Sequence, residues 1–364
     1  MDRKLKVGVL GATGMVGQRF VTLLQNHPWF DLAAVAASPR SAGKTYREAV
    51  GDRWKLGEDN PMPEKAADLI VQDVSHVEEI ASQVDFVFSA VDMSKDQIRA
   101  IEEEYAKAET PVVSNNSAHR WTPDVPMMIP EINPQHTDVI EAQKKRLGTK
   151  RGFIAVKPNC SIQSYTPALY ALREFEPTVV VATTYQAISG AGKTFRDWPE
   201  IIDNVIPYIP GEEEKSEQEP LKVFGEVKDG QIVKAARPLI TTQCLRVPVS
   251  NGHIAAVFVS FAKKPTKEEI IERWNNYSGV PQQLGLPSAP KHFMRYMEEP
   301  DRPQTKLDRD YEHGMGISLG RLREDLVYDY RFIGLSHNTL RGAAGGAVET
   351  AELLTAKHFI TPKD

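Results

Sequence analysis

The chain has few cysteines. Cys160 and Cys244 are the only two among 364 residues, which is too few for the disulfide framework of a small secreted protein. We therefore expect a protein of a reducing compartment, with the cytoplasm as its location. No spacing of cysteine and histidine suits a metal ion, so we expect no metal site.

The sequence also lacks an excess of positive charge and long hydrophobic runs. Its 44 Lys and Arg residues are outnumbered by 49 Asp and Glu residues, which gives a net charge of −5. This balance leaves no electrostatic footprint for nucleic acid, and no Lys/Arg-rich block suggests an anionic membrane. No segment has the pattern of a signal peptide or a membrane span. We therefore expect a soluble protein that acts on a small molecule, with neither nucleic acid nor a membrane as a partner.

The length indicates two domains, because 364 residues exceed the size at which one hydrophobic core stops growing. Short apolar strands alternate with helical patterns in the first half of the chain. After the β-branched run Val179–Tyr185, antiparallel-type strands with longer connections replace this alternation. The pattern predicts an α/β domain followed by an α+β domain.

A glycine-rich turn follows the first predicted strand. Lys4–Leu10 is a short apolar run, and a helical pattern begins at Val16. The turn between them reads Gly11-Ala12-Thr13-Gly14-Met15-Val16-Gly17. Strand, glycine turn and helix form the context in which a dinucleotide pyrophosphate binds a helix N-terminus. Because the spacing is Gly-x-x-Gly-x-x-Gly, a plain tight turn is the alternative.

The second predicted strand, Leu32–Ala37, is not followed by the acidic residue that grips the ribose 2′-hydroxyl of NAD. The chain continues with Ser38-Pro39-Arg40-Ser41-Ala42-Gly43-Lys44. Hydroxyl groups and cations suit a 2′-phosphate, so this loop predicts NADP rather than NAD. A solvated basic loop is the alternative.

A strand that ends near Val156 leads into the segment Lys157-Pro158-Asn159-Cys160-Ser161. Asn159 is a typical helix N-cap, which would place Cys160 in the first turn of a helix that runs to about Glu174. Free N–H groups and the positive end of the helix dipole favour a thiolate there. We therefore expect Cys160 to ionise readily and to act as a nucleophile, and a small buried hydrophobic residue is the alternative.

Other polar segments lie at the ends of predicted strands. Asn115–Trp121 follows the strand Val112–Ser114, where open α/β sheets bind ligands, and its Arg120 could clamp a phosphate. Of nine histidines, His253 is the one placed beside an arginine at a strand entrance. The acidic run after Gly211 is most simply interpreted as a solvated helix start.

Together and in this order, these segments resemble aspartate-semialdehyde dehydrogenase over nearly the whole chain. The segments are GATGMVGQ, SNNSAHR, PNCSIQ, TTYQAISGAGK, RVPVSNGH and NTLRGAA, and the PNCS form is similar to the archaeal and fungal branch. The resemblance implies a Rossmann-type NADP-binding domain at residues 1–157, completed by the C-terminal helix 338–364. It implies a glyceraldehyde-3-phosphate-dehydrogenase-like α+β domain for catalysis and dimerisation at 158–337, in a homodimer or homotetramer.

The resemblance also implies roles for individual residues. Cys160 would be the nucleophile, His253 the acid/base and Gln186 the residue that orients the acyl intermediate. Arg246 and Glu212 would hold the substrate's carboxylate and amino group, although three consecutive glutamates leave the register of Glu212 open by one residue. The further substrate-binding residues would be Arg120 and Lys215, which bind phosphate, and Asn159. The cofactor would be lined by Gly11, Thr13, Gly14, Met15, Val16, Gly17, Ser38, Arg40, Ser41, Lys44, Ser89, Gly190, Ala191, Gly192 and Asn338.

The implied reaction is the NADPH-dependent reductive dephosphorylation of β-aspartyl phosphate to aspartate β-semialdehyde, in lysine, threonine, methionine and isoleucine biosynthesis. The Cys160 thiolate would form a thioester and release phosphate, and His253 would take the thiol proton and return a proton to the hemithioacetal oxygen. The alternatives are an N-acetyl-glutamyl-phosphate or malonyl-CoA reductase with the same chemistry, and a non-catalytic NADP-binding sensor.

Overall fold

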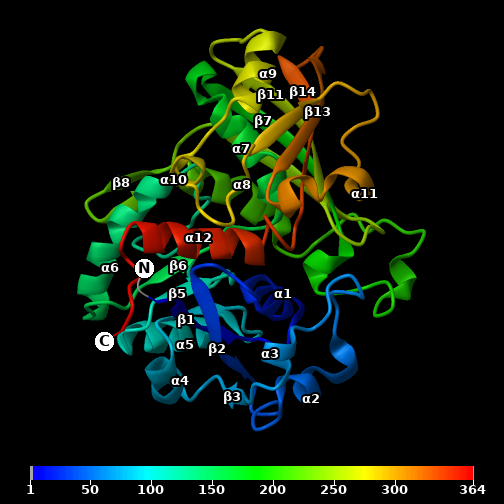
Figure 1. The fold of residues 1–364 in the computed structure, drawn as a ribbon. Helices are drawn as coiled ribbons and strands as arrows, with labels where there is room; N and C mark the ends of the chain where they lie inside the picture. The colour runs from blue at the N-terminus through cyan, green and yellow to red at the C-terminus, as the bar shows by residue number, and fades with distance from the viewer. Residues whose placement is uncertain (1–2, 364) are drawn as a thin grey trace.

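A computed structural model describes residues 3–363, which form two six-stranded sheets and a small two-stranded one. Figure 1 shows the first sheet with its helices at the bottom and the second sheet at the top. The last helix, drawn in red, lies between them. Each large sheet therefore organises one part of the chain.

All strands of the first sheet are parallel, in the order β3-β2-β1-β4-β5-β6. The strands are β1 (Leu5–Leu10), β2 (Phe30–Ala37), β3 (Val71–Asp73), β4 (Phe86–Ser89), β5 (Val112–Ser114) and β6 (Ile154–Val156). The helices between them are α1 (Met15–Leu24), α2 (Tyr46–Val50), α3 (Glu64–Ala67), α4 (Val77–Gln83), α5 (Lys95–Lys107) and α6 (Ile140–Leu147), with 3₁₀ turns η1 (Gly51–Arg53) and η2 (Pro134–Val139). This is the order of a dinucleotide-binding fold, which binds ligands at the carboxyl ends of β1 and β4, where the order reverses.

The second sheet is mixed, in the order β10-β7-β11-β14-β13-β12. Its strands are β7 (Pro177–Gln186), β10 (Leu239–Arg246), β11 (His253–Phe261), β12 (Met294–Met297), β13 (Ile317–Glu324) and β14 (Tyr330–Ser336), and β8 (Glu226–Lys228) pairs with β9 (Gln231–Val233). The α-helices around it are α7 (Thr166–Ala171), α8 (Glu212–Val223), α9 (Lys267–Asn275), α10 (Val280–Leu284) and α11 (Thr305–Asp308). The 3₁₀ turns are η3 (Ser161–Ser164), η4 (Arg173–Phe175), η5 (Ile188–Ala191), η6 (Pro199–Ile201) and η7 (Tyr311–Gly314).

Not every strand of the second sheet is antiparallel. The pairs β7–β10 and β12–β13 are parallel, whereas β11 lies antiparallel to both of its neighbours. Burial alternates strictly along β11, with every second residue buried and the others only half-buried. One face of the sheet therefore packs on the core, and the other face stays partly open.

The helix expected to run from Cys160 to about Glu174 is broken into η3, α7 and η4. Tyr165 between the first two has φ −139° and ψ −30°, outside the helical region. Pro167 lies two residues later and has no backbone N–H to donate to Gln163, so together with the non-helical Tyr165 it separates η3 from α7. The expectation of one long helix was wrong for this reason.

The final helix, α12 (Ala344–Ala356), returns to the first sheet and contacts α1 and β5. It is buried along almost its full length. The fully buried Arg341 just before it donates to Glu349 in the helix at 2.7 Å and to Glu131 at 2.7 and 2.9 Å. Because buried charges need partners, this pairing holds the end of the chain against the loop after β5.

Candidate active site

A cavity of about 390 Å³ lies where the carboxyl ends of β5 and β6 meet those of β7 and β10. Its lining brings together residues from both sheets and from the last segment of the chain. The predicted site residues among the lining are Val16, Arg120, Asn159, Cys160, Gln186, Gly190, Glu212, Lys215, Arg246 and Asn338. Segments separated by more than 300 residues thus share one polar cavity.

Cys160 and His253 form a pair in this region, with 3.3 Å between Sγ and Nε2. His253 begins β11 and is fully buried. The backbone N–H of Ala187 donates to its Nδ1 at 3.0 Å. Since Nδ1 accepts this bond, the neutral ring carries its proton on Nε2, which faces the sulfur. The imidazole is therefore oriented as a donor toward Cys160.

The surroundings of the pair favour its uncharged form. Burial, and after it the Glu212 carboxylate, raise the pKa of Cys160 to about 12, against the opposing charges of Arg120, Arg246 and Lys157. Burial and then the Arg246 charge lower the pKa of His253 to about 3. The expectation that Cys160 ionises readily was wrong in the absence of substrate. Cys160 precedes the four-residue turn η3 rather than lying inside a long helix, so desolvation outweighs the short dipole.

Asn159 and Gln186 both donate to Glu212, at 2.7 and 3.1 Å, and the side-chain oxygen of Asn159 also accepts the Ser161 N–H at 2.9 Å. Lys215 donates to the other oxygen of Glu212 at 3.1 Å. Burial alone would raise the pKa of Glu212, but Lys215 and these amides hold it below its usual value. The cavity therefore contains a buried carboxylate that stays ionised.

Only the first of the three glutamates reaches the cavity. Glu212 lines it, Glu213 accepts the Cys244 N–H at 3.3 Å, and Glu214 is exposed. Its place in the cavity favours Glu212 as the glutamate of the open register, and its role stays a prediction. The interpretation of this segment as a solvated helix start was wrong for Glu212, because its side chain is buried and lines the cavity.

Two guanidinium groups flank the cavity. Arg246 at the end of β10 donates to the Ala187 carbonyl at 2.7 Å, and burial lowers its pKa. Arg120 donates to the carbonyls of Lys157 at 2.9 Å and Asn115 at 3.2 Å. Both arginines are anchored by the backbone and keep further N–H groups in the cavity lining.

The glycine turn fits a dinucleotide. Gly11 has φ +79°, and a Cβ on Gly17 would collide with the Gly11 carbonyl oxygen, so both positions need glycine. Gly14 caps α1 without a side-chain bond to the helix, and Met15 and Val16 follow as its first residues. Free N–H groups at such a helix start suit a pyrophosphate.

The other predicted cofactor residues lie in several parts of the chain. Ser38, Arg40 and Lys44 are exposed after β2, and Ser41 is buried in the same turn, so charged and hydroxyl groups fit a 2′-phosphate. Thr13 uses its carbonyl to accept from Gln18 at 2.9 Å. The remaining cofactor residues are Ser89, Gly190, Ala191, Gly192 and Asn338.

These remaining residues differ in their burial and in their contacts near the cavity. Ser89 is fully buried and accepts from Asn116 at 3.1 Å, so its hydroxyl does not face the cavity. Asn338 donates to Ser189 and accepts the Gly252 N–H, both at 2.8 Å. A Cβ on Gly190 would lie 3.0 Å from Arg246 and 3.2 Å from His253. Ala191 and Gly192 do not line the cavity.

Three residues near the pair were not predicted from the sequence. Glu219 accepts from Arg120 at 2.9 Å, Lys157 is buried with its pKa lowered to about 7 by desolvation, and a Cβ on Gly342 would lie 2.7 Å from the Cys160 Cβ. Glu219 had a detectable signal, because it lies seven residues after Glu212 and shares its helix face. Lys157 and Gly342 had no detectable signal in the sequence apart from the motifs in which they lie.

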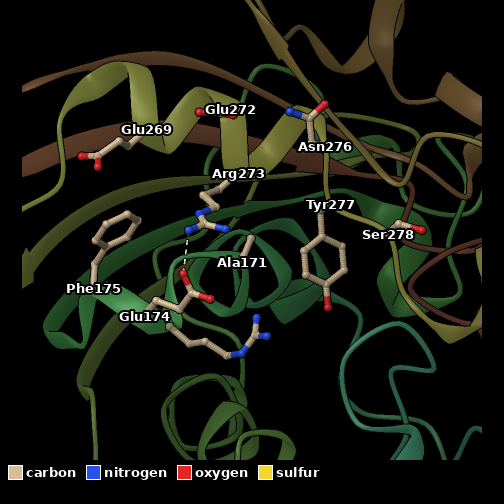
Figure 2. A pocket seen from close by; sticks show the side chains of 10 residues that line it. Ala171, Glu174, Phe175, Glu269, Glu272, Arg273, Asn276, Tyr277 and Ser278 are labelled. Carbon is tan, nitrogen blue, oxygen red and sulfur yellow. Dashed lines mark hydrogen bonds and ion pairs between the residues drawn. The ribbon is translucent and has the colours of Figure 1, made fainter.

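Figure 2 shows a second cavity, of about 450 Å³, between η4 and α9. Arg273 and Glu174 form an ion pair across it at 2.6 Å, and both side chains are more than half exposed. It shares no lining residue with the cavity at Cys160. Exposed ion pairs contribute little to the free energy of folding, so this pair does not by itself mark a functional site.

Residues 3–363 contain no group of three or more metal-binding side chains placed around one point. Within the same range, no helix combines the length and apolar character that a membrane span requires.

The class of the protein is shown by family models that match both of its large sheets, the dinucleotide-binding one and the mixed one with the cysteine–histidine pair. The family model described as "Semialdehyde dehydrogenase, NAD binding domain" matches residues 6–140, and "Semialdehyde dehydrogenase, dimerisation domain" matches residues 168–341. The predicted fold class is confirmed.

Relatives narrow the class to one family. Aspartate-semialdehyde dehydrogenase of Aspergillus fumigatus is 42% identical over 98% of this chain and 99% of its own, and that of Archaeoglobus fulgidus is 42% identical over 98% and 100%. A crystal structure of the Candida albicans enzyme with NADP has a TM-score of 0.87 at 39% identity, covering 98% of this chain and 100% of that one. The chain belongs to the aspartate-semialdehyde dehydrogenase family, as the motifs predicted.

Proposed function

We propose that this enzyme converts β-aspartyl phosphate to aspartate β-semialdehyde with NADPH, through a thioester on Cys160, in the biosynthesis of lysine, threonine, methionine and isoleucine. The observation that carries the proposal is the Cys160–His253 pair, 3.3 Å apart, beside a cavity that contains the ionised Glu212 and two guanidinium groups. A nucleophile, a donor and opposite charges for an amino acid are thus present together.

In the first step the Cys160 sulfur bonds to the acyl carbon, the carbon–oxygen bond to phosphate breaks, and phosphate leaves. The neutral thiol must first lose its proton, which the positive charges of Arg120, Arg246 and Lys157 favour. When bound, NADPH supplies a hydride to the thioester carbon. Expulsion of the thiolate then releases the aldehyde and restores Cys160.

His253 acts through Nε2, which faces the sulfur. As a neutral donor it can hydrogen-bond the thiolate and the charged oxygen of the hemithioacetal. To take the thiol proton, as an acid/base group does, the ring would carry protons on both nitrogens, and the Ala187 N–H contact at 3.0 Å would have to open. We therefore assign the acid/base role to His253 together with a movement at Ala187, and Gln186 orients the acyl group.

The two ends of the substrate have separate partners. Arg246 offers a planar fork for the α-carboxylate, and Glu212 offers a carboxylate for the α-ammonium group. Arg120 and Lys215 bind the phosphate, and Asn159 holds Glu212 in place. Malonyl, succinyl and N-acetyl-glutamyl groups have no free ammonium, so Glu212 would keep only its bonds to Asn159, Gln186 and Lys215. The lost charge-assisted bond to the substrate would cost about 1–3 kcal/mol.

The cofactor is NADP, held by the glycine turn and by the loop from Ser38 to Lys44. Residues 1–157 with the final segment 338–364 are proposed as the cofactor domain, and residues 158–337 as the catalytic and dimerisation domain. The half-buried face of the second sheet, with Ile254, Ala256 and Phe258 of β11, is the proposed contact with a second copy in a homodimer or homotetramer. The free thiols Cys160 and Cys244 suit the reducing cytoplasm.

The test is phosphate-dependent reduction of NADP by aspartate semialdehyde, measured beside NAD and beside succinate and malonate semialdehydes. We expect NADP and aspartate semialdehyde to be preferred, the latter by roughly tenfold or more, with Glu212→Gln narrowing that gap. Preference for another semialdehyde, or an unchanged ratio in Glu212→Gln, would show that the substrate assignment is wrong.

A further inference from the structure

Glu219 is a fully buried carboxylate on α8 that lies behind the active-site cavity. It is seven residues after Glu212, so the two side chains share one face of the helix. Glu212 lines the cavity, whereas Glu219 does not. Any effect of Glu219 on the reaction therefore has to pass through its neighbours.

Its two oxygens accept from two different loops. One oxygen accepts from Nη1 of Arg120 at 2.9 Å, and the other accepts the backbone N–H of Asn159 at 2.5 Å. Arg120 follows β5 in the chain, and Asn159 follows β6 and precedes Cys160. One carboxylate thus connects the loop that carries Arg120, which is proposed to bind phosphate, to the loop that carries the nucleophile Cys160. Short bonds that involve charged groups are the strong ones.

The helix around Glu219 is held in place as well. Pro220 has no N–H to donate to the Ser216 carbonyl four residues earlier. The hydroxyl of Tyr165 donates to this carbonyl instead, at 2.6 Å. Because the missing helical bond is replaced by a buried tyrosine, α8 continues through the proline and the direction of Glu219 is set by the core.

We infer that Glu219 is a positioning residue, which orients the Arg120 guanidinium for the phosphate group and holds the peptide before Cys160. This inference rests on the proposed function. The carbonyls of Lys157 and Asn115 accept from two other nitrogens of Arg120, at 2.9 and 3.2 Å, so Glu219 completes the third contact that defines the plane of the guanidinium. The specificity for phosphate then depends on a residue that never contacts it.

The first test is Glu219→Gln, because a glutamine of the same shape can present only one oxygen acceptor to the two donors. In the oxidative direction we expect the KM for phosphate to rise roughly tenfold or more and kcat to fall, while the KM for NADP stays within about twofold. The matched control is Glu214→Gln, an exposed glutamate on the same helix. The inference is overturned if the KM for phosphate is unchanged or lower, or if all the KM values rise alike.

A double-mutant cycle separates positioning from general loss of structure. If Glu219 acts through Arg120, Glu219→Gln should raise the KM for phosphate much less in an Arg120→Gln background. Equal effects in both backgrounds would contradict the inference. If Glu219→Gln does not fold, Glu219→Asp keeps the charge but is too short to reach both loops, and the same rise in the KM for phosphate is expected.

Wild-type activity distinguishes this inference from the proposed function. If the wild-type enzyme shows no phosphate-dependent reduction of NADP with aspartate semialdehyde, the proposed function fails and the inference fails with it. If the wild-type reaction proceeds and Glu219→Gln follows the Glu214→Gln control, only the inference fails.

Discussion

The glycine turn and the cysteine–histidine pair depend on opposite features of the chain. The turn lies within seven consecutive residues, Gly11–Gly17, and its conformation depends on where side chains are absent. The pair joins Cys160 and His253, which are 93 residues apart. Charged groups from other segments shift the pKa of its thiol.

This difference determines how each region should respond to substitution. A backbone site fails when a side chain is added, because no space exists for it. A side-chain site fails when one group is removed, because the charge balance around the thiol changes. Substitutions in one region should therefore leave the other largely intact.

The largest effect is expected for Cys160→Ser, because a hydroxyl lacks thiolate character. Turnover should fall at least roughly a thousandfold, while NADPH binding, followed by fluorescence, stays unchanged. The matched control is Cys244→Ser, since Cys244 is buried and donates weakly to Ser216 at 3.6 Å. Substantial activity in Cys160→Ser would rule out covalent catalysis at this residue.

Gly17→Ala should have the next largest effect, on the opposite region. Its Cβ would collide with the Gly11 carbonyl and the Ala12 backbone, so NADPH affinity should fall by roughly a hundredfold. Alkylation of Cys160 should continue at the wild-type rate. Gly14→Ala is the control, because the nearest atom to its Cβ would be 3.7 Å away. Equal losses in the two variants would show that close packing is not what the turn requires.

Arg40→Ala combined with Lys44→Ala tests the loop that follows β2. Each charged contact to a 2′-phosphate contributes about 1.5–3 kcal/mol, so NADPH affinity should fall at least roughly tenfold. NADH has no such phosphate and should bind almost unchanged. Titration of both cofactors measures the difference, and parallel losses would show that this loop does not recognise the 2′-phosphate.

The smallest effect concerns the thiol itself. The Glu212 charge raises the pKa of Cys160, so Glu212→Gln should lower this pKa and increase the thiolate fraction at any pH below it. Iodoacetamide should then alkylate Cys160 roughly threefold to tenfold faster at pH 8. In the wild-type protein the rate should rise through pH 7–10, because the thiol pKa is raised to about 12. A slower reaction in Glu212→Gln would contradict the sign of this interaction.

Features encoded in adjacent residues were predicted well. The strand β5 has the expected bounds, Val112–Ser114, and β2 ends at Ala37 as expected. The helix expected from Val16 begins one residue earlier, as α1. By contrast, the single helix expected from Cys160 to about Glu174 is broken into η3, α7 and η4.

The sequence named the residues of the candidate site, but it did not predict the pKa values of their side chains. The motifs indicated Cys160, His253, Gln186 and Arg246, and the structure brings them around one region. The pKa of the thiol could not be predicted, because burial depends on how α8 and β11 pack. The contact between Glu219 and the Asn159 N–H is likewise between residues 60 positions apart.

The sequence by itself determined the alternation of strands and helices in the first half of the chain, the glycine turn and the absence of an acidic residue after β2. These features depend on periodicity and backbone conformation among neighbouring residues. Only the tertiary structure decided which glutamate enters the cavity, which nitrogen of His253 faces the sulfur and how strongly the thiol resists ionisation. Desolvation and Coulomb interactions depend on distance in space, and the chain brings those groups together only when it folds.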